Sequence, residues 1–286
     1  MAQNLSDDIL YAIFLQALPS EFYLSTLRPP RKPWMVPPFT FSLVSRSWRT
    51  LVLSRPTLWS RISVKSRSES ENDDSDPGDP IIYHILNRWL SLSSHAPLWI
   101  QMDLSEELET VHETILSIFV KEYLRWSVAR INIEYWRYPT SPEPPTFPLQ
   151  GFSPITSLSL RLFGSYYLTV FVDLSSFIND HFSRLEYLSI TAGATVRLPA
   201  DRNALRLPRL RSLIYESREG ANLDDVRCIL SASPHLELLN LKIWGKSIST
   251  STPDRGSLRL PYLTSLSLTA FTQLAASYVI WKIIRF

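Results

Sequence analysis

Glycine and cysteine are scarce in this chain, and each scarcity excludes one class of site. Only seven of the 286 residues are glycine. None of them forms the Gly-rich loop that lets a backbone approach a phosphate closely, so a nucleotide-binding loop is not expected. Cys228 is the only cysteine, which excludes an intrachain disulfide and favours a reducing compartment. The apolar residues around Cys228 predict a buried, unreactive thiol.

Net charge and long apolar runs are also small. The 29 basic and 27 acidic residues leave a net charge of +2, which is too little to indicate binding to nucleic acid or to an anionic membrane. The first residues contain no basic and apolar leader, and no run of 18 apolar residues precedes the C-terminal region. We therefore expect a cytoplasmic or nuclear protein whose partners include neither nucleic acid nor a membrane.

The motifs of common enzyme active sites are missing as well. The five histidines lack the HxxxH and HExxH spacings of metal sites, and no GxSxG motif is present. We expect no metal, no cofactor and no catalytic residue. One alternative of another class stays open, a hydrolase that uses Cys228 or a serine as its nucleophile.

Short apolar segments of one shape recur down the last two-thirds of the chain. Each follows the pattern L-x-x-L-x-L, with other large apolar residues at some positions. The clear copies are residues 155–160, 185–190, 210–215, 236–241 and 263–268, and a weaker copy is 128–133. Successive copies begin 27, 30, 25, 26 and 27 residues apart. Such a period is typical of leucine-rich solenoids, in which each unit buries its apolar face only against its neighbours.

This pattern predicts a parallel sheet of short strands whose leucines point inward. The residues between the leucines would line the open face, namely Ser157, Ser159, Arg161, Tyr187, Ser189, Thr191, Ser212, Glu216, Asn240, Lys242, Ser265, Ser267 and Thr269. We expect this face to bind a protein substrate, with specificity from an aromatic residue and the charged or amide residues around it. The candidate substrate-binding residues are Arg161, Tyr187, Glu216, Asn240 and Lys242. A plain solvated sheet face is the alternative.

The segments between these strands are expected to be helical or irregular. Residues 224–232 predict a helix, and the stretch before the clear repeats predicts helices at 81–90 and 111–126 and a strand at 98–102. The asparagine that usually bonds the backbone of the turn after each strand is absent, which favours a short, irregular arc. The apolar C-terminus leaves two interpretations open: the chain is truncated there, or a terminal helix caps the solenoid.

A helical module is predicted before the repeats. Ser6 has the position of an N-cap, and Asp7 and Asp8 follow in the first turn, where carboxylates suit the helix dipole. One broad apolar stripe then runs along the helix, formed by Leu5, Ile9, Leu10, Ile13 and Phe14. A second helix is predicted over residues 40–55, and a short helical turn over 56–62. Prolines cluster at 19–38 and 139–154, which predicts irregular loops, and the acidic, serine-rich stretch 66–80 predicts disorder.

Three N-terminal patterns together resemble an F-box. They are Leu5-Ser-Asp-Asp-Ile9-Leu10-x-x-Ile13-Phe14, then Leu43-Val44-Ser-Arg-Ser-Trp48-Arg49-x-Leu51-Val52, then Pro56-x-Leu58-Trp59-x-x-Ile62. The chain is similar in particular to the F-box-like proteins abundant in mushroom-forming fungi. Residues 85–100 also resemble the segment that follows the F-box in that group.

The resemblance implies a substrate-recruiting subunit of an SCF-type cullin–RING ubiquitin ligase, acting in ubiquitin-dependent degradation. An F-box binds a Skp-type adaptor, and the C-terminal domain holds the protein substrate. Carried over onto this chain, the adaptor contact would lie at or behind Leu5, Ser6, Ile9, Leu10, Ile13, Phe14, Val44 and Trp48. Two departures from the family occur: Leu5-Ser6 stands where Leu-Pro is usual, and a twenty-residue Pro-rich insert separates the first two helices.

The resulting expectation is an α/β protein of three parts. An F-box-like helical module spans 1–64 and includes the Pro-rich insert 19–38. An acidic linker spans 65–80, and a leucine-rich-repeat domain spans 81–286. The alternative function is a leucine-rich-repeat interaction scaffold that binds a partner protein without engaging the ligase.

Overall fold

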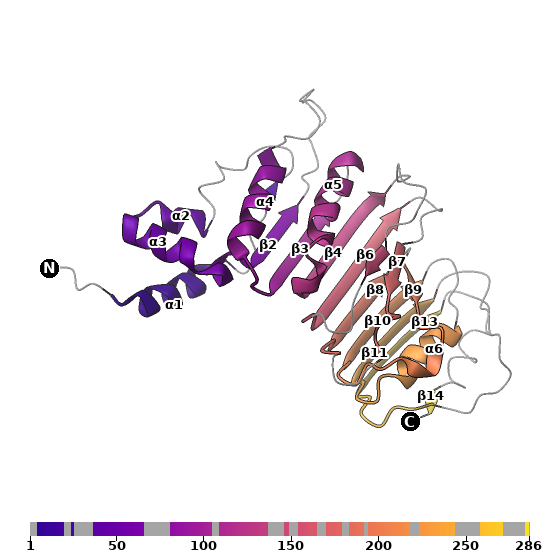
Figure 1. Ribbon diagram of the computed structural model, residues 1–286. Coiled ribbons are helices and arrows are strands. Elements are labelled where there is room, and N and C mark those ends of the chain that lie inside the picture. The colour runs from indigo at the N-terminus through magenta and orange to yellow at the C-terminus, as the bar shows by residue number, and fades with distance from the viewer. Residues whose placement is uncertain are drawn as a thin grey trace. The chain divides into compact units, whose positions relative to one another are not determined.

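A computed structural model describes residues 5–19, 24–25, 37–65, 81–104, 109–136, 146–148, 154–164, 170–178, 183–191, 194–217, 223–243, 258–270 and 284–285. The chain forms two compact units, Met1–Trp126 and Ser127–Phe286. Figure 1 labels their elements in chain order. The helical segment 1–64 therefore shares one unit with the first helices of the predicted repeat domain. Most of the predicted linker lies outside the described residues, although Lys65 is the last residue of a strand.

The first unit combines helices with a small parallel sheet. Its elements are α1 (Asp7–Ala17), β1 (Leu24–Ser25), α2 (Phe39–Ser42), α3 (Arg46–Ser54), the 3-10 helix η2 (Pro56–Trp59), β2 (Arg61–Lys65), α4 (Ile81–Ser93), β3 (Leu98–Leu104), α5 (Glu109–Val120) and the 3-10 helix η3 (Tyr123–Arg125). Strands β1, β2 and β3 pair in chain order, all parallel. Helices α4 and α5 lie side by side against one face of this sheet (Figure 1).

Helix α1 forms as the sequence predicts. The Ser6 hydroxyl accepts a hydrogen bond from the Ile9 amide (3.4 Å), and two aspartates lie in the first turn. Both features satisfy the amide groups that a helix leaves unpaired at its start. The helix ends at Ala17 because Leu18 precedes Pro19 and adopts an extended backbone.

The continuous helix predicted over residues 40–55 is wrong, because two short helices replace it. Ser45 between them is extended, and its hydroxyl accepts from the Trp48 amide (3.2 Å), so a new N-cap begins α3. The Arg49 Nε atom donates to the Ser42 carbonyl (3.0 Å) and so satisfies an acceptor at the C-terminal end of α2. Serine competes with helical backbone bonds in this way at caps and turns.

The short helical turn predicted over 56–62 is correct only in its first part. Pro56–Trp59 forms η2, but Ile62 lies in strand β2, where it pairs with Ile100 of β3. The predicted strand at 98–102 and helix at 81–90 are confirmed by β3 and α4. The helix predicted over 111–126 ends earlier, at Val120, because a 3-10 turn follows and Trp126 begins a strand.

Three aromatic side chains join the helical segment to α4. Phe39, Trp59 and Trp89 contact one another edge to face, with ring centroids 4.8 to 5.5 Å apart. Both tryptophans are fully buried. The Trp59 indole also donates to the Val52 carbonyl (2.9 Å), so it connects α3 to the same cluster. Edge-to-face pairs add about 0.5–1.5 kcal/mol each beyond burial, which makes this cluster the centre of the first unit.

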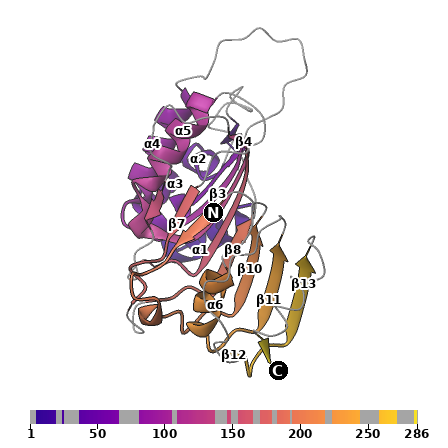
Figure 2. The same ribbon diagram turned by 90° about the vertical axis from the view of Figure 1, so that its right-hand side faces the viewer.

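The second unit is a solenoid of parallel strands. Its elements are β4 (Trp126–Trp136), β5 (Thr146–Pro148), β6 (Ser157–Gly164), β7 (Val170–Asp173), β8 (Tyr187–Thr191), β9 (Ala194–Arg197), η4 (Arg202–Ala204), β10 (Ser212–Ser217), α6 (Leu223–Ser231), β11 (Leu238–Ile243), β12 (Leu258–Arg259), β13 (Ser265–Ala270) and β14 (Ile284–Arg285). Strands β4, β6, β8, β10, β11 and β13 lie in this order, and every neighbouring pair is parallel. Figure 2 shows the last of these strands edge to edge, with α6 on one side.

The strand prediction from the six apolar segments is confirmed. The fourth position of the pattern is in register across the sheet: Leu158, Leu188, Leu213, Leu239 and Leu266 pair in sequence. The first four of these leucines are fully buried. Leu266 is half-buried, because its strand β13 has a paired neighbour on one side only within the described residues.

Backbone hydrogen bonds link each repeat to the next just before the strands. The carbonyl of the second repeat position accepts two amides from the following repeat, as Thr156 does from Glu186 (2.8 Å) and Tyr187 (3.1 Å). The carbonyls of Glu186, Arg211 and Glu237 accept in the same way. The prolines that precede several strands occupy tight turns; the Leu210 amide, for example, donates to the Leu207 carbonyl (3.1 Å) around Pro208.

The returning segments differ partly from expectation. Helix α6 confirms the helix predicted at 224–232. Strands β5, β7 and β9, however, pair in a second parallel sheet, although β5 lies in the Pro-rich stretch predicted to be an irregular loop. Phe171, Val172 and Val196 in these strands favour extended backbone. The suggested C-terminal capping helix falls mainly outside the described residues; Ile284–Arg285 pair with β12 as strand β14.

We predict that Trp59→Ala lowers the free energy of unfolding by about 3–5 kcal/mol, because it removes a fully buried indole from the aromatic cluster. Urea denaturation followed by circular dichroism measures this change. Leu124→Ala is the control, since Leu124 is 53% exposed and should change stability by less than about 0.5 kcal/mol. A loss in Trp59→Ala no larger than in the control would show that the cluster does not hold the unit together.

Candidate interaction surfaces

One side of α1 exposes large apolar side chains. Leu5, Ile9 and Ile13 are 49%, 51% and 46% exposed. Ile9 and Ile13 are four residues apart, little more than one helical turn, so they lie on one face of α1, and Leu5 is exposed just before the N-cap Ser6. About half of each side chain is exposed among the described residues, so an apolar surface is open here.

The opposite side of α1 belongs to the core of the first unit. Phe14 is 1% exposed, stacks on Phe41 with centroids 4.7 Å apart, and meets the Trp48 ring edge to face at 4.8 Å. These contacts attach α1 to α2 and α3. Phe14 and Trp48, which belong to the predicted adaptor-binding residues, therefore lie beneath the exposed apolar side of α1 and support it. Leu10 is half-buried between the exposed and the buried side of the helix.

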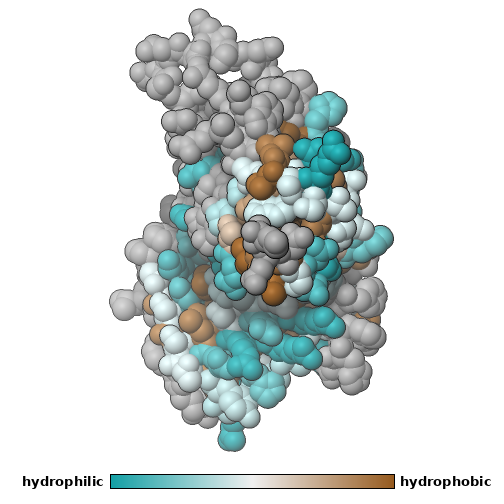
Figure 3. All heavy atoms as spheres, turned by 90° about the vertical axis from the view of Figure 1, so that its left-hand side faces the viewer, coloured by the Kyte–Doolittle hydropathy of each residue, from teal (hydrophilic) through white to brown (hydrophobic). Residues whose placement is uncertain are grey.

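The break between α2 and α3 adds two more exposed apolar residues. Leu43 and Val44 are 56% and 61% exposed, and their amides close the turn by donating to Thr40 and Phe41 (3.2 and 3.3 Å). Val44 was in the predicted adaptor set, whereas Leu43 was not. Figure 3 looks from the side of the helical segment and shows hydrophobic surface among polar side chains.

Polar contacts fix α1 against η2. Arg55 makes an ion pair with Asp8 (3.1 Å) and lies over the Tyr11 ring, 5.0 Å from its centroid. The Tyr11 hydroxyl also bonds the Thr57 hydroxyl. Asp8 is almost fully exposed, so its ion pair adds little stability. The contacts mainly set the angle at which α1 presents its apolar face.

The five predicted substrate-binding residues lie on one face of the second unit's sheet, in three rows. Arg161, Glu216 and Lys242 belong to one row, which Thr191 completes. Asn240 lies in the next row and Tyr187 in the third. The side chains of Glu216 and Lys242 form an ion pair at 3.9 Å. The charges along the row alternate, so the face has no strong field of one sign.

One amide on this face has an unsatisfied acceptor. The Asn240 Oδ1 atom is buried and makes no hydrogen bond within the described residues. A buried acceptor without a partner costs free energy, and a donor from a bound chain would satisfy it. Ser189, predicted to be open, is buried and therefore offers little to a ligand.

Tyr215 in β10 and Cys228 in α6 have raised pKa values. Burial, and secondly the Asp225 carboxylate, raise the pKa of Tyr215 to about 12. Burial also raises the pKa of the Cys228 thiol, which donates to the Arg202 carbonyl (3.0 Å). The thiol is half-buried, not fully buried as predicted. A raised pKa keeps it protonated at neutral pH, which is the opposite of what a nucleophilic cysteine needs.

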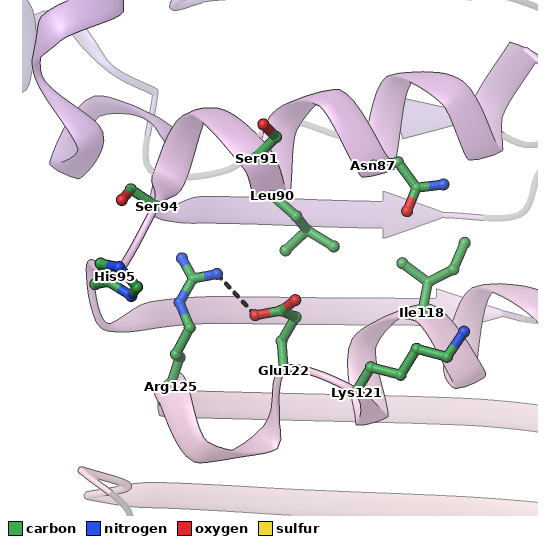
Figure 4. Close-up of a pocket in the computed structure, with 9 residues that line it drawn as sticks. All are labelled: Asn87, Leu90, Ser91, Ser94, His95, Ile118, Lys121, Glu122 and Arg125. Atoms are coloured by element: carbon green, nitrogen blue, oxygen red, sulfur yellow. Dashed lines mark hydrogen bonds and ion pairs between the residues drawn. The ribbon is translucent and has the colours of Figure 1, made fainter.

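A polar cleft of about 440 Å³ lies between α4, α5 and η3 (Figure 4). Arg125 is its central charge, but its guanidinium is already engaged by Glu122 (2.8 Å), the Ser93 hydroxyl (2.6 Å) and the Ala96 carbonyl (3.2 Å). These bonds tie η3 to the turn after α4. Lys121 and His95 at the rim make no side-chain hydrogen bond within the described residues, but they point away from each other (Figure 4). The side chains of the cleft therefore serve to hold η3 against the turn after α4.

The described residues contain no cluster of three or more side chains suited to hold a metal ion. In the same part of the chain, no helix is long and apolar enough to cross a membrane. Comparisons with protein-family models, curated proteins and solved structures find no match for this chain.

We predict that stability falls as the pH rises from 10 towards 12, and that Tyr215 contributes to this fall. Its folded-state pKa of about 12 exceeds the ordinary value of 10.0, so its contribution is complete below pH 10 and is lost as the pH rises through the folded value. Urea denaturation across this range should show a shallower fall in Tyr215→Phe. Tyr262→Phe, which removes an exposed phenol, is the control. Equal slopes in the wild type and Tyr215→Phe would contradict the prediction.

Proposed function

We propose that this chain is the substrate-recruiting F-box subunit of an SCF-type ubiquitin ligase. The observation that carries the proposal is the two-sided α1. Phe14 anchors the helix in the core. Leu5, just before the helix, and Ile9 and Ile13 within it stay about half exposed. A helix with one apolar side bound and the other open is suited to dock onto a partner protein.

The α2–α3 turn supports the same proposal. Leu43 and Val44 expose apolar side chains. The F-box resemblance implies that Val44 is part of the adaptor contact. Burying the exposed half of each of these side chains contributes about 1 kcal/mol. Five such groups would form the apolar part of an interface with a Skp-type adaptor.

The departure at Ser6 is compatible with this role. The family usually has proline after the first leucine, and Ser6 instead supplies a side-chain cap to α1. The cap begins the helix at Asp7, and Ile9 and Ile13 then lie on one face of it. The serine thus preserves the presentation of the surface.

The substrate would bind the strand face of the second unit. The face offers one ion pair, several hydroxyl groups and the unsatisfied Asn240 acceptor, which suits a protein surface or an extended chain more than a small apolar ligand. In this arrangement the protein has no catalytic step of its own and brings the substrate to the ligase. The alternative is a scaffold that uses only this face and does not engage the adaptor.

We predict that the purified chain binds a Skp-type adaptor and that the double variant Ile9→Asp/Val44→Asp lowers the affinity at least about 30-fold. Two buried apolar contacts would become charges without partners, each costing 1 kcal/mol or more. Biolayer interferometry with immobilised adaptor gives the dissociation constants. Both positions are more than half exposed, so the variant should stay folded, which circular dichroism checks.

The matched control is Leu124→Asp/Ile178→Asp, which charges two side chains of similar exposure, 53% and 50%, outside α1 and the α2–α3 turn. It should bind the adaptor as the wild type does. A folded wild type that does not bind would refute the ligase role and leave the scaffold function. Equal losses in both variants would refute the assignment of the binding surface.

A further inference from the structure

A row of exposed side chains lines the edge of the second unit's sheet at which the strands begin. Its members each stand three residues before the register position shared by β8, β10, β11 and β13. They are Arg184, Arg209, His235 and Tyr262, and all four are exposed. We call these four residues the entry row.

Tight turns hold the entry row in place. The amides of Leu210, Leu236 and Leu263 close the turns around Arg209, His235 and Tyr262, at 3.1, 3.3 and 3.2 Å. The following leucine points into the core in the first two of these turns, so the residue before it faces solvent. The spacing along the row is seen directly in one pair, because the His235 and Tyr262 rings lie 5.1 Å apart between centroids.

Arg184 and Arg209 occupy adjacent positions of the row, and the charges near them are not paired with them among the described residues. Within the part of the chain that the structure describes, neither guanidinium makes an ion pair or a side-chain hydrogen bond. The charged residues beside them are Glu186, Arg211 and Glu237, and the last two pair with each other at 2.8 Å. Like charges on adjacent strands are unfavourable, so an anion placed between the two arginines would relieve their repulsion.

The other half of the row has different chemistry. His235 and Tyr262 present two tilted rings side by side, a platform on which an aromatic side chain can stack. The entry row therefore combines a cationic pair with an aromatic pair along one line. It shares no residue with the strand face to which substrate binding was assigned.

We propose that the entry row binds an extended acidic segment of a partner protein. Its anionic group lies between Arg184 and Arg209, where two guanidinium groups can each donate two hydrogen bonds. An aromatic residue of the segment lies on His235 and Tyr262. Strands are about 4.8 Å apart, so the centres of the two pairs are about 10 Å apart, and an extended peptide covers that distance in three residues. A carboxylate and a phosphate both suit this position, since each fits the fork of arginine.

The test uses fluorescein-labelled synthetic peptides in a Ser/Gly background and the full chain, with fluorescence anisotropy as the readout. One peptide has two adjacent aspartates and a tryptophan three residues away, a second has phosphoserine in place of the aspartates, and a third has serines there. Each is made with the tryptophan before and after the anionic position. A further acidic peptide has the tryptophan directly beside the anion.

We expect at least one acidic peptide with the three-residue spacing to bind at least about tenfold more tightly than the serine peptide. Arg184→Gln/Arg209→Gln should abolish that difference, and Tyr262→Ala should weaken binding of the spaced peptide alone. The control Arg88→Gln removes an exposed arginine of α4 and should change nothing. The better of the aspartate and phosphoserine peptides identifies the anion.

Three results would overturn the proposal. The acidic and serine peptides bind equally or not at all, the double arginine variant binds as tightly as the wild type, or Arg88→Gln weakens binding as much as the double variant does. All the substitutions are at exposed positions, and circular dichroism verifies that each variant is folded. Adaptor binding does not enter the readout, so the result is independent of the proposed ligase role.

Discussion

The interaction on which the fold depends is the burial of each repeat's leucines against the adjacent repeats. A single six-residue strand has no core of its own, so Leu188 is covered only because β6 and β10 supply Leu158 and Leu213 in register. The backbone bonds just before the strands lock this register, since one carbonyl accepts two amides from the next repeat. A slip of one residue would turn every leucine to the open face.

That constraint also decides where function can lie. The inward face is committed to packing, and the turns before the strands are committed to backbone bonds. The open face, the edge of the sheet and the ends of the array are the surfaces left to vary. In the second unit the open face holds the ion pair between Glu216 and Lys242, while its edge holds two arginines and two rings in one line.

In the first unit, aromatic residues form the buried contacts that hold the elements together. Trp59 and Trp89 bring η2 and α4 together around Phe39, and β2 then pairs with β3. The helical segment is thereby built onto the same kind of parallel strand that forms the repeats. This arrangement leaves α1 at the periphery of the first unit. Phe14 is the one fully buried residue of this helix and attaches it to the core. The outer apolar face of α1 remains open.

The sequence by itself determined the period, the inward leucines, helix α1 with its cap, and most of the helices, because each depends on contacts close along the chain or on a repeated pattern. Only the tertiary structure decided three further matters. Ser45 caps a new helix instead of continuing the old one, and the weak strands β5, β7 and β9 are extended because they pair with each other. The amphipathic pattern also does not show which of its residues the chain itself covers. Phe14 and Ile13 are equally apolar neighbours in sequence, but packing against Phe41 and Trp48 buries Phe14 and leaves Ile13 exposed.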